Sequence, residues 1–175
     1  MKYLYMTIVF TALALPAAAM AAGTPNTNSL ANTSCKAQQT AMGATTFKAA
    51  YGSNAFGKCV SKATVTAAAA VQNAAKSCKA QQADTNFANA ATNPNHLTFD
   101  AFYGANGKGK SADANAYGKC VSKLTQQTTN AQTKADIAAA KTCKTELAAS
   151  KTNFAGTYGA GKNAFGVCVS RHSKL

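Results

Sequence analysis

Two short stretches decide the fold: Ser34-Cys35-Lys36-Ala37-Gln38-Gln39 and Asn54-Ala55-Phe56-Gly57-Lys58-Cys59-Val60-Ser61-Lys62. The first recurs at Ser77–Gln82 and, more loosely, at Thr142–Glu146. The second recurs at Asn115–Lys123 and Asn163–Arg171. Between them, each copy carries Phe-x3-Tyr-Gly, beginning at Phe47, Phe99 and Phe154. A match this long and ordered predicts three copies of one structural unit, at about 34–62, 77–123 and 142–171.

The segments that connect the units indicate long helices. Residues 60–77 and 121–142 are rich in Ala, Gln, Lys and Thr and contain neither Gly nor Pro. Their small or apolar residues recur at helical spacings of three and four, and alanine has the highest helix propensity. We predict long helices at about 55–82 and 114–149 and short helices around Cys35 and through Cys168. Turns are predicted at 49–54 and 158–163, with an expanded loop between Thr85 and Ala114.

Helix geometry then restricts the pairing of the six cysteines. Cys59 and Cys78 lie on one predicted helix, about 28 Å apart at 1.5 Å per residue. Cys120 and Cys143 are about 35 Å apart by the same rise. A disulfide needs Cα atoms within about 7 Å, so neither pair can bond. The prediction is one bond across each hairpin, at alternating ends of a bundle: Cys35–Cys59, Cys78–Cys120 and Cys143–Cys168. Three such bonds contribute roughly 10 kcal/mol by chain-entropy arguments.

Residues 1–21 have the organisation of an export signal. Lys2 supplies a positive charge, residues 3–15 are apolar, Pro16 interrupts them, and small residues surround Ala21. We predict cleavage after Ala21 or Ala22 and a secreted, periplasmic or cell-envelope location. An uncleaved membrane anchor is the competing interpretation, because about 20 apolar residues can span a bilayer. Residues 22–33 are expected to be a flexible N-terminal segment, followed by one domain at 34–175.

The composition explains why such a chain needs disulfides. It has 41 alanines and no tryptophan, and only 19 Leu, Ile, Val or Phe residues from Ala22 onward. So few large apolar residues place it near the composition of disordered chains. An exported chain meets an oxidising environment, and an even number of cysteines favours paired bonds. The predicted fold is all-α: an antiparallel helical bundle of three disulfide-stapled helical hairpin repeats.

The units resemble a repeat found in exported bacterial proteins, many of them actinobacterial. That pattern runs Cys-(Lys/Arg), Phe, Tyr-Gly and Asn-Ala-Phe-Gly-Lys-Cys-Val-Ser, and the match covers Ser34 to Lys174. The resemblance implies export and a cysteine-paired architecture, and it implies no activity. A weaker similarity is to the phosphate-starvation-inducible repeat family, which also pairs two cysteines across a short hairpin. This chain lacks that family's charged turn.

Few residues here suit catalysis or metal binding. Gly104–Ser111 fits G-x4-G-K-S, the phosphate-binding loop of nucleotide hydrolases, but that loop needs a strand before it and a parallel sheet. We interpret it as a flexible basic turn. His96 and His172 have no carboxylate or free thiol at ligand spacing. The five carboxylates are scattered along the chain: Asp84, Asp100, Asp113, Asp136 and Glu146. A hydrolase would require two of them to converge. We predict no enzyme activity, no metal site and no cofactor.

The aromatic residues and lysines of the units allow two interpretations. Three aromatics surround each turn, and they either form a small core or stack on bases and sugars beside lysines. The second interpretation supplies our candidate polyanion contacts: Lys48, Lys58, Lys108, Lys110, Lys119 and Lys162. Without the leader, 17 basic and five acidic residues remain. This charge either keeps an alanine-rich protein soluble or attracts polyanions.

The sequence therefore predicts an exported, non-enzymatic basic protein that associates with anionic material. The expected partners are an anionic cell-envelope polymer, nucleic acid or an anionic membrane surface. The alternative is a secreted effector or inhibitor that binds a protein partner, since disulfide scaffolds often serve in this way.

Overall fold

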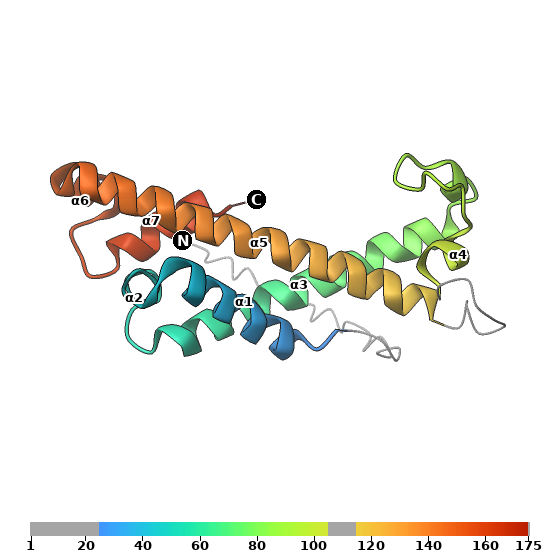
Figure 1. The fold of residues 1–175 in the computed structure, drawn as a ribbon, viewed down its shortest axis with the longest axis horizontal. Helices are drawn as coiled ribbons and strands as arrows, with labels where there is room; N and C mark the ends of the chain where they lie inside the picture. The colour runs from blue at the N-terminus through green and yellow to red at the C-terminus, as the bar shows by residue number, and fades with distance from the viewer. Residues whose placement is uncertain (1–24, 105–114, 175) are drawn as a thin grey trace, which may run out of the picture.

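The computed structural model describes residues 25–104 and 115–174, and every regular element in these ranges is helical. Two long helices, α3 (Ala55–Ala83) and α5 (Ala116–Ala149), run antiparallel along an elongated bundle (Figure 1). The shorter elements gather around their ends: α1 (Thr27–Met42), α2 (Ala44–Tyr51), η1 (Phe87–Asn89), α4 (Phe99–Tyr103), α6 (Lys151–Tyr158) and α7 (Ala164–His172). The all-α stapled bundle predicted from the sequence is confirmed.

Several element boundaries differ from the prediction. Helix α1 begins at Thr27, so residues 27–33 of the expected flexible segment are helical. Asn26 caps this helix, because its side-chain oxygen accepts hydrogen bonds from the backbone N–H groups of Asn28 and Ser29. The units also contain helices that the sequence did not predict: α2, α6 and, inside the expected loop, η1 and α4. Helices α2 and α6 each end at a glycine with positive φ, Gly52 or Gly159.

Three disulfides close three hairpins. They join Cys35 to Cys59, Cys78 to Cys120 and Cys143 to Cys168, with Cα–Cα distances of 5.9, 6.0 and 6.0 Å. These are the pairs predicted from helix geometry. We call residues 27–66 hairpin 1, residues 74–103 with 116–128 hairpin 2, and residues 139–172 hairpin 3. Hairpin 2 lies at one end of the bundle, and hairpins 1 and 3 lie at the other (Figure 1).

Each disulfide lies in a small apolar cluster of its own hairpin. Both cysteines of every pair are fully buried or nearly so, and one large aromatic residue packs beside each pair: Phe47, Phe99 and Phe154. Between the clusters, α3 buries alanines such as Ala67 and Ala70, while α5 buries Thr125, Thr129 and Thr133. Small side chains let the helix backbones pack closely, and the large apolar residues are concentrated around the disulfides.

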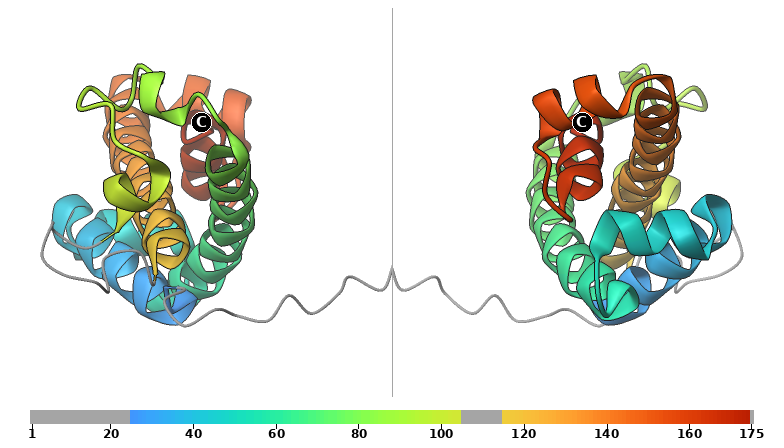
Figure 2. Two further views of the ribbon diagram at one scale, coloured as in Figure 1. Left: turned by 90° about the vertical axis from the view of Figure 1, so that its right-hand side faces the viewer. Right: turned by 90° about the vertical axis from the view of Figure 1, so that its left-hand side faces the viewer.

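Hairpins 1 and 3 pack directly against each other. Helix α2 contacts α7, and Met42 and Ala50 of hairpin 1 join the apolar cluster of hairpin 3. The end-on views in Figure 2 show α6 and α7 at one side of the bundle and α1 and α2 at the opposite side, with the contact between α2 and α7 joining them. Gly166 lies at this contact, where a Cβ atom would come within 2.7 Å of the Ala50 carbonyl oxygen. The two hairpins are therefore joined at the contact between α2 and α7.

We expect Gly166→Ala to lower the free energy of unfolding by about 1–3 kcal/mol, because the added methyl group overlaps the backbone carbonyl of Ala50 as well as the side chain of Asn163. Urea unfolding followed by circular dichroism measures the change. Gly156→Ala is the matched control: this glycine is inside α6 with open space around its Cβ position. That substitution is expected to stabilise by about 0.5–1 kcal/mol. Equal effects of the two would contradict the close contact.

Within residues 25–104 and 115–174, no helix combines the length and the apolar character needed to cross a bilayer. The predicted export signal at residues 1–21 and the segment 105–114 lie outside the described residues.

Candidate functional site

The same contacts recur beside all three disulfides. In each hairpin the phenylalanine and tyrosine of Phe-x3-Tyr-Gly pack with ring centroids 4.9, 5.0 or 4.8 Å apart. The tyrosine hydroxyl then donates a hydrogen bond to the residue three positions after the first cysteine. The three bonds are Tyr51 to Gln38 (2.5 Å), Tyr103 to Gln81 (2.9 Å) and Tyr158 to Glu146 (2.8 Å). Sequence reasoning missed this bond, although both of its positions recur in every unit.

The aromatic residues of the units serve the core. Phe47 is 1% exposed, and Phe99 and Phe154 are buried. The remaining six are buried or half-buried: Tyr51, Phe56, Tyr103, Tyr117, Tyr158 and Phe165. The interpretation that these residues form a small core beneath each disulfide is therefore confirmed. Exposed aromatics for base stacking are not present at these nine positions.

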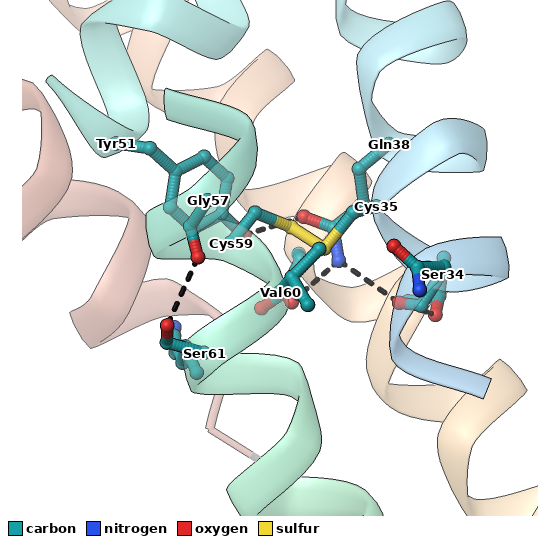
Figure 3. Close-up of a disulfide and its surroundings, with 12 residues drawn as sticks. Ser34, Cys35, Gln38, Tyr51, Gly57, Cys59, Val60 and Ser61 are labelled. Carbon is teal, nitrogen blue, oxygen red and sulfur yellow. Dashed lines mark hydrogen bonds between the residues drawn. A yellow bond between two sulfur atoms is a disulfide. The ribbon is translucent and has the colours of Figure 1, made fainter. Parts of the chain in front are cut away.

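Hairpin 1 is linked to α5 by a buried polar cluster beside its disulfide (Figure 3). Gln38 is 2% exposed, and its amide donates to Asp136 Oδ2 at 3.1 Å and to Ser34 Oγ at 3.2 Å. Gln132 donates to Asp136 Oδ1, also at 3.1 Å. Burial and the negative charge of Asp136 raise the pKa of Tyr51, so its hydroxyl stays protonated and keeps donating to Gln38.

Two features of this cluster favour a structural role. The adjoining cavity has a volume of only about 20 Å³, which is room for about one water molecule. Asp136 is 4% exposed, and both of its oxygens accept from amides. Gln132 also donates to the backbone carbonyl of Ser173, which fastens the chain after α7 to α5. The cluster therefore positions three helices and leaves little space for a substrate.

His172 has a partner that the sequence did not reveal. Its Nε2 lies 3.2 Å from Glu146 Oε1 and 2.9 Å from the hydroxyl of Tyr158. Arg171 stacks over the Tyr158 ring at 5.5 Å and donates to the backbone carbonyl of Thr157. No carboxylate lies at ligand spacing from His172 along the sequence, and the hairpin supplies one from a distant position by bringing α5 and α7 together. His96 remains exposed, with Nδ1 3.0 Å from the Ala88 carbonyl oxygen.

The sulfur atoms of Cys143 and Cys168 lie within 4.8 Å of a ring nitrogen of His172. Both sulfurs are committed to the disulfide, so this group does not bind a metal in the oxidised protein. Among the described residues it is the one group of three or more metal-ligating side chains.

The basic residues that the structure describes are all at the surface. Each of the 15 described Lys and Arg side chains is exposed. Among the described residues, the one contact between a basic and an acidic side chain is His172–Glu146, which is an ion pair when the histidine is protonated. The repeat fixes eight basic positions beside the cysteines. Lys36, Lys79 and Lys144 follow a first cysteine; Lys58 and Lys119 precede a second cysteine; Lys62, Lys123 and Arg171 lie three positions after it. Every stapled hairpin therefore displays cations around its disulfide.

The three hairpins differ in their carboxylates more than in their cations. Hairpin 2 carries four described basic residues and two exposed carboxylates, Asp84 and Asp100. Hairpins 1 and 3 together carry nine basic residues and one carboxylate, Glu146, which is paired with His172. We call these nine the basic end: Lys36, Lys48, Lys58, Lys62, Lys141, Lys144, Lys151, Lys162 and Arg171. A hollow of about 270 Å³ at this end is lined by Lys151 and Lys162 and by no carboxylate.

The candidate contacts fall into three groups. Lys48, Lys58 and Lys162 belong to the basic end, and Lys119 belongs to hairpin 2. Lys108 and Lys110 lie outside the described residues, as do Asp113 and most of the G-x4-G-K-S stretch. Residues 99–103 before that stretch form helix α4 and not the strand that a phosphate-binding loop requires.

Comparisons of the chain with protein-family models, with curated proteins and with solved structures found no match.

Proposed function

We propose that this protein is an exported, non-enzymatic protein that binds a linear anionic polymer of the cell envelope through its basic end. The observation that carries the proposal is the excess of positive charge on hairpins 1 and 3, which display nine exposed cations against one carboxylate that already contacts His172. Phosphate or carboxylate groups spaced along a flexible polymer can contact several of these cations at once.

The disulfides support export. Three bonds, each with both cysteines buried, are typical of proteins that mature in an oxidising compartment outside the cytoplasm. The sequence of residues 1–21 supports the same route, because its charged, apolar and small-residue segments follow the order of an export signal.

The surface favours a polymer over the other polyanions. The unit aromatics are buried or half-buried, which leaves them poorly placed to stack on nucleic-acid bases. Among the described large apolar residues, only Val65 and Leu97 are exposed, so insertion into a membrane has little support. The remaining attraction is electrostatic, and a linear chain of anionic groups satisfies it without stacking or insertion.

Inorganic polyphosphate is a suitable probe, and the repeat supplies matched variants. Lys36, Lys58 and Lys62 of hairpin 1 occupy the same repeat positions as Lys79, Lys119 and Lys123 of hairpin 2. Each triple substitution to glutamine removes the same charge. We expect the hairpin 1 variant to lose at least tenfold in affinity at about 50 mM salt, and the hairpin 2 variant less than threefold. The difference arises because the Debye length at this salt concentration is about 14 Å, shorter than the bundle.

Fluorescence anisotropy of labelled polyphosphate across a salt series measures these affinities, with unfolding curves to show that both variants fold. Affinity should fall steeply as salt rises. Equal losses of affinity in the two variants would contradict a localised site and would show that binding depends only on the total charge of the protein. Absence of binding at low salt would refute the proposed function. Binding to envelope extract that is unchanged at about 0.5 M salt would instead favour a protein partner.

A further inference from the structure

Hairpin 3 differs from the other two hairpins at the two positions that face its disulfide. Three residues after the first cysteine, hairpins 1 and 2 carry Gln38 and Gln81, whereas hairpin 3 carries Glu146. Four residues after the second cysteine, they carry alanine and leucine, whereas hairpin 3 carries His172. Both changes introduce a metal-ligating group beside a pair of cysteines.

The four groups already surround one point. Both sulfur atoms and a ring nitrogen of His172 lie within 4.8 Å of one another. Glu146 Oε2 lies 3.9 Å from Cys168 Sγ, and Glu146 Oε1 lies 3.2 Å from His172 Nε2. A tetrahedral Zn²⁺ with bonds of about 2.0–2.3 Å places its ligand atoms about 3.3–3.8 Å apart. The two separations that involve Glu146, 3.9 and 3.2 Å, are close to those of a four-ligand site, whereas the two bonded sulfurs must move apart to reach them.

We propose that, in its dithiol state, hairpin 3 binds one Zn²⁺ through Cys143, Cys168, His172 and Glu146. The Cα atoms of the two cysteines are 6.0 Å apart on α5 and α7, so side-chain rotation is enough to separate the sulfurs. Tyr158 donates to Glu146 and is placed to orient that ligand from outside the site. The exposed cations Lys144 and Arg171 offset the negative charge of two thiolates and a carboxylate.

The dithiol state exists in the chain before its disulfides form, and a water-soluble phosphine regenerates it. One phosphine is oxidised to its oxide with oxygen taken from water, and the disulfide is reduced to two thiols. Zn²⁺ then displaces both thiol protons into solvent. Reoxidation by a disulfide-exchange oxidant removes two electrons from the thiolates, re-forms the sulfur–sulfur bond and releases the metal. Metal binding and this disulfide are therefore mutually exclusive.

Co²⁺ is a spectroscopic probe for the site, and Zn²⁺ displaces it. The protein with only the Cys143–Cys168 bond reduced, and the other two shown to be intact by peptide mass spectrometry, should bind one Co²⁺ per molecule, with tetrahedral visible bands and a sulfur-to-metal band of two thiolates. The double variant Glu146→Gln with His172→Ala has, at these two positions, the residue types that hairpin 1 has at Gln38 and Ala63. It should lose at least tenfold in affinity, while its oxidised form keeps the helix content of the parent. Circular dichroism of the oxidised proteins checks that point.

Variants of two different cysteine pairs provide the matched control. They are needed because the thiols of an unfolded chain also bind metals. Replacing Cys143 and Cys168 with serine should abolish the two-thiolate band, whereas replacing Cys35 and Cys59 should leave it unchanged. Equal binding by the two variants, or unchanged affinity in the Glu146 and His172 variant, would overturn the proposal. This test is independent of polyphosphate binding by the oxidised protein, so either proposal can fail alone.

Discussion

Replacing Cys78 and Cys120 with serine is expected to lower the free energy of unfolding by about 4 kcal/mol. Their disulfide spans 42 positions, the longest loop of the three, so its removal returns the most chain entropy to the unfolded state. Both sulfurs are fully buried in the cluster that contains Phe87 and Phe99. A serine pair would place hydroxyl groups in that apolar site and add to the loss.

Chemical unfolding followed by far-ultraviolet circular dichroism measures this loss, because the chain has no tryptophan. Peptide mass spectrometry should show the other two bonds intact. The Cys35 and Cys59 pair is the comparison, with a shorter loop and an expected loss of about 3.5 kcal/mol. A loss below about 1 kcal/mol for the hairpin 2 pair would show that its unfolded chain stays compact without the bond.

Phe47→Ala is expected to lower the free energy of unfolding by about 3–5 kcal/mol. Phe47 is 1% exposed and packs against Tyr51 and the Cys35–Cys59 pair. The surrounding side chains are few and held by the disulfide, so they cannot collapse into the space left by the ring. The cost therefore includes both the lost apolar burial and the remaining cavity.

The same unfolding measurement applies, and Phe56→Ala is the matched control. Phe56 belongs to the same hairpin but is only half-buried, so its removal should cost clearly less. If both substitutions cost the same small amount, the apolar cluster would not be what stabilises hairpin 1 beyond its disulfide.

The sequence predicted the long helices closely because local information was sufficient. Helix α3 was expected at about 55–82 and occupies Ala55–Ala83; α5 was expected at about 114–149 and occupies Ala116–Ala149. Helical spacing and high alanine content determine both. The disulfide pairs followed, because a rigid helix keeps Cys59 from Cys78 and Cys120 from Cys143.

The missed features depend on contacts across the fold. Nothing in the residues near Asp136 indicates that Gln38, 98 positions earlier, buries and hydrogen-bonds its carboxylate. The pairing of His172 with Glu146 likewise requires α7 to fold back on α5. Helices α2 and α6 were missed because glycines at their ends resemble turn signals. The start of α1 could have been predicted from the sequence, since Asn26 is a favourable N-cap residue.

Because every disulfide joins cysteines of the same hairpin, the covalent chain consists of three loops, each closed by one disulfide, and two connecting segments that no disulfide bridges. One connection is the part of α3 between Cys59 and Cys78, and the other is the part of α5 between Cys120 and Cys143. A protease that cuts once inside either connection divides the molecule into two pieces that no covalent bond holds together. A cut inside one of the loops leaves the chain linked. Non-reducing electrophoresis therefore distinguishes the two kinds of cleavage directly.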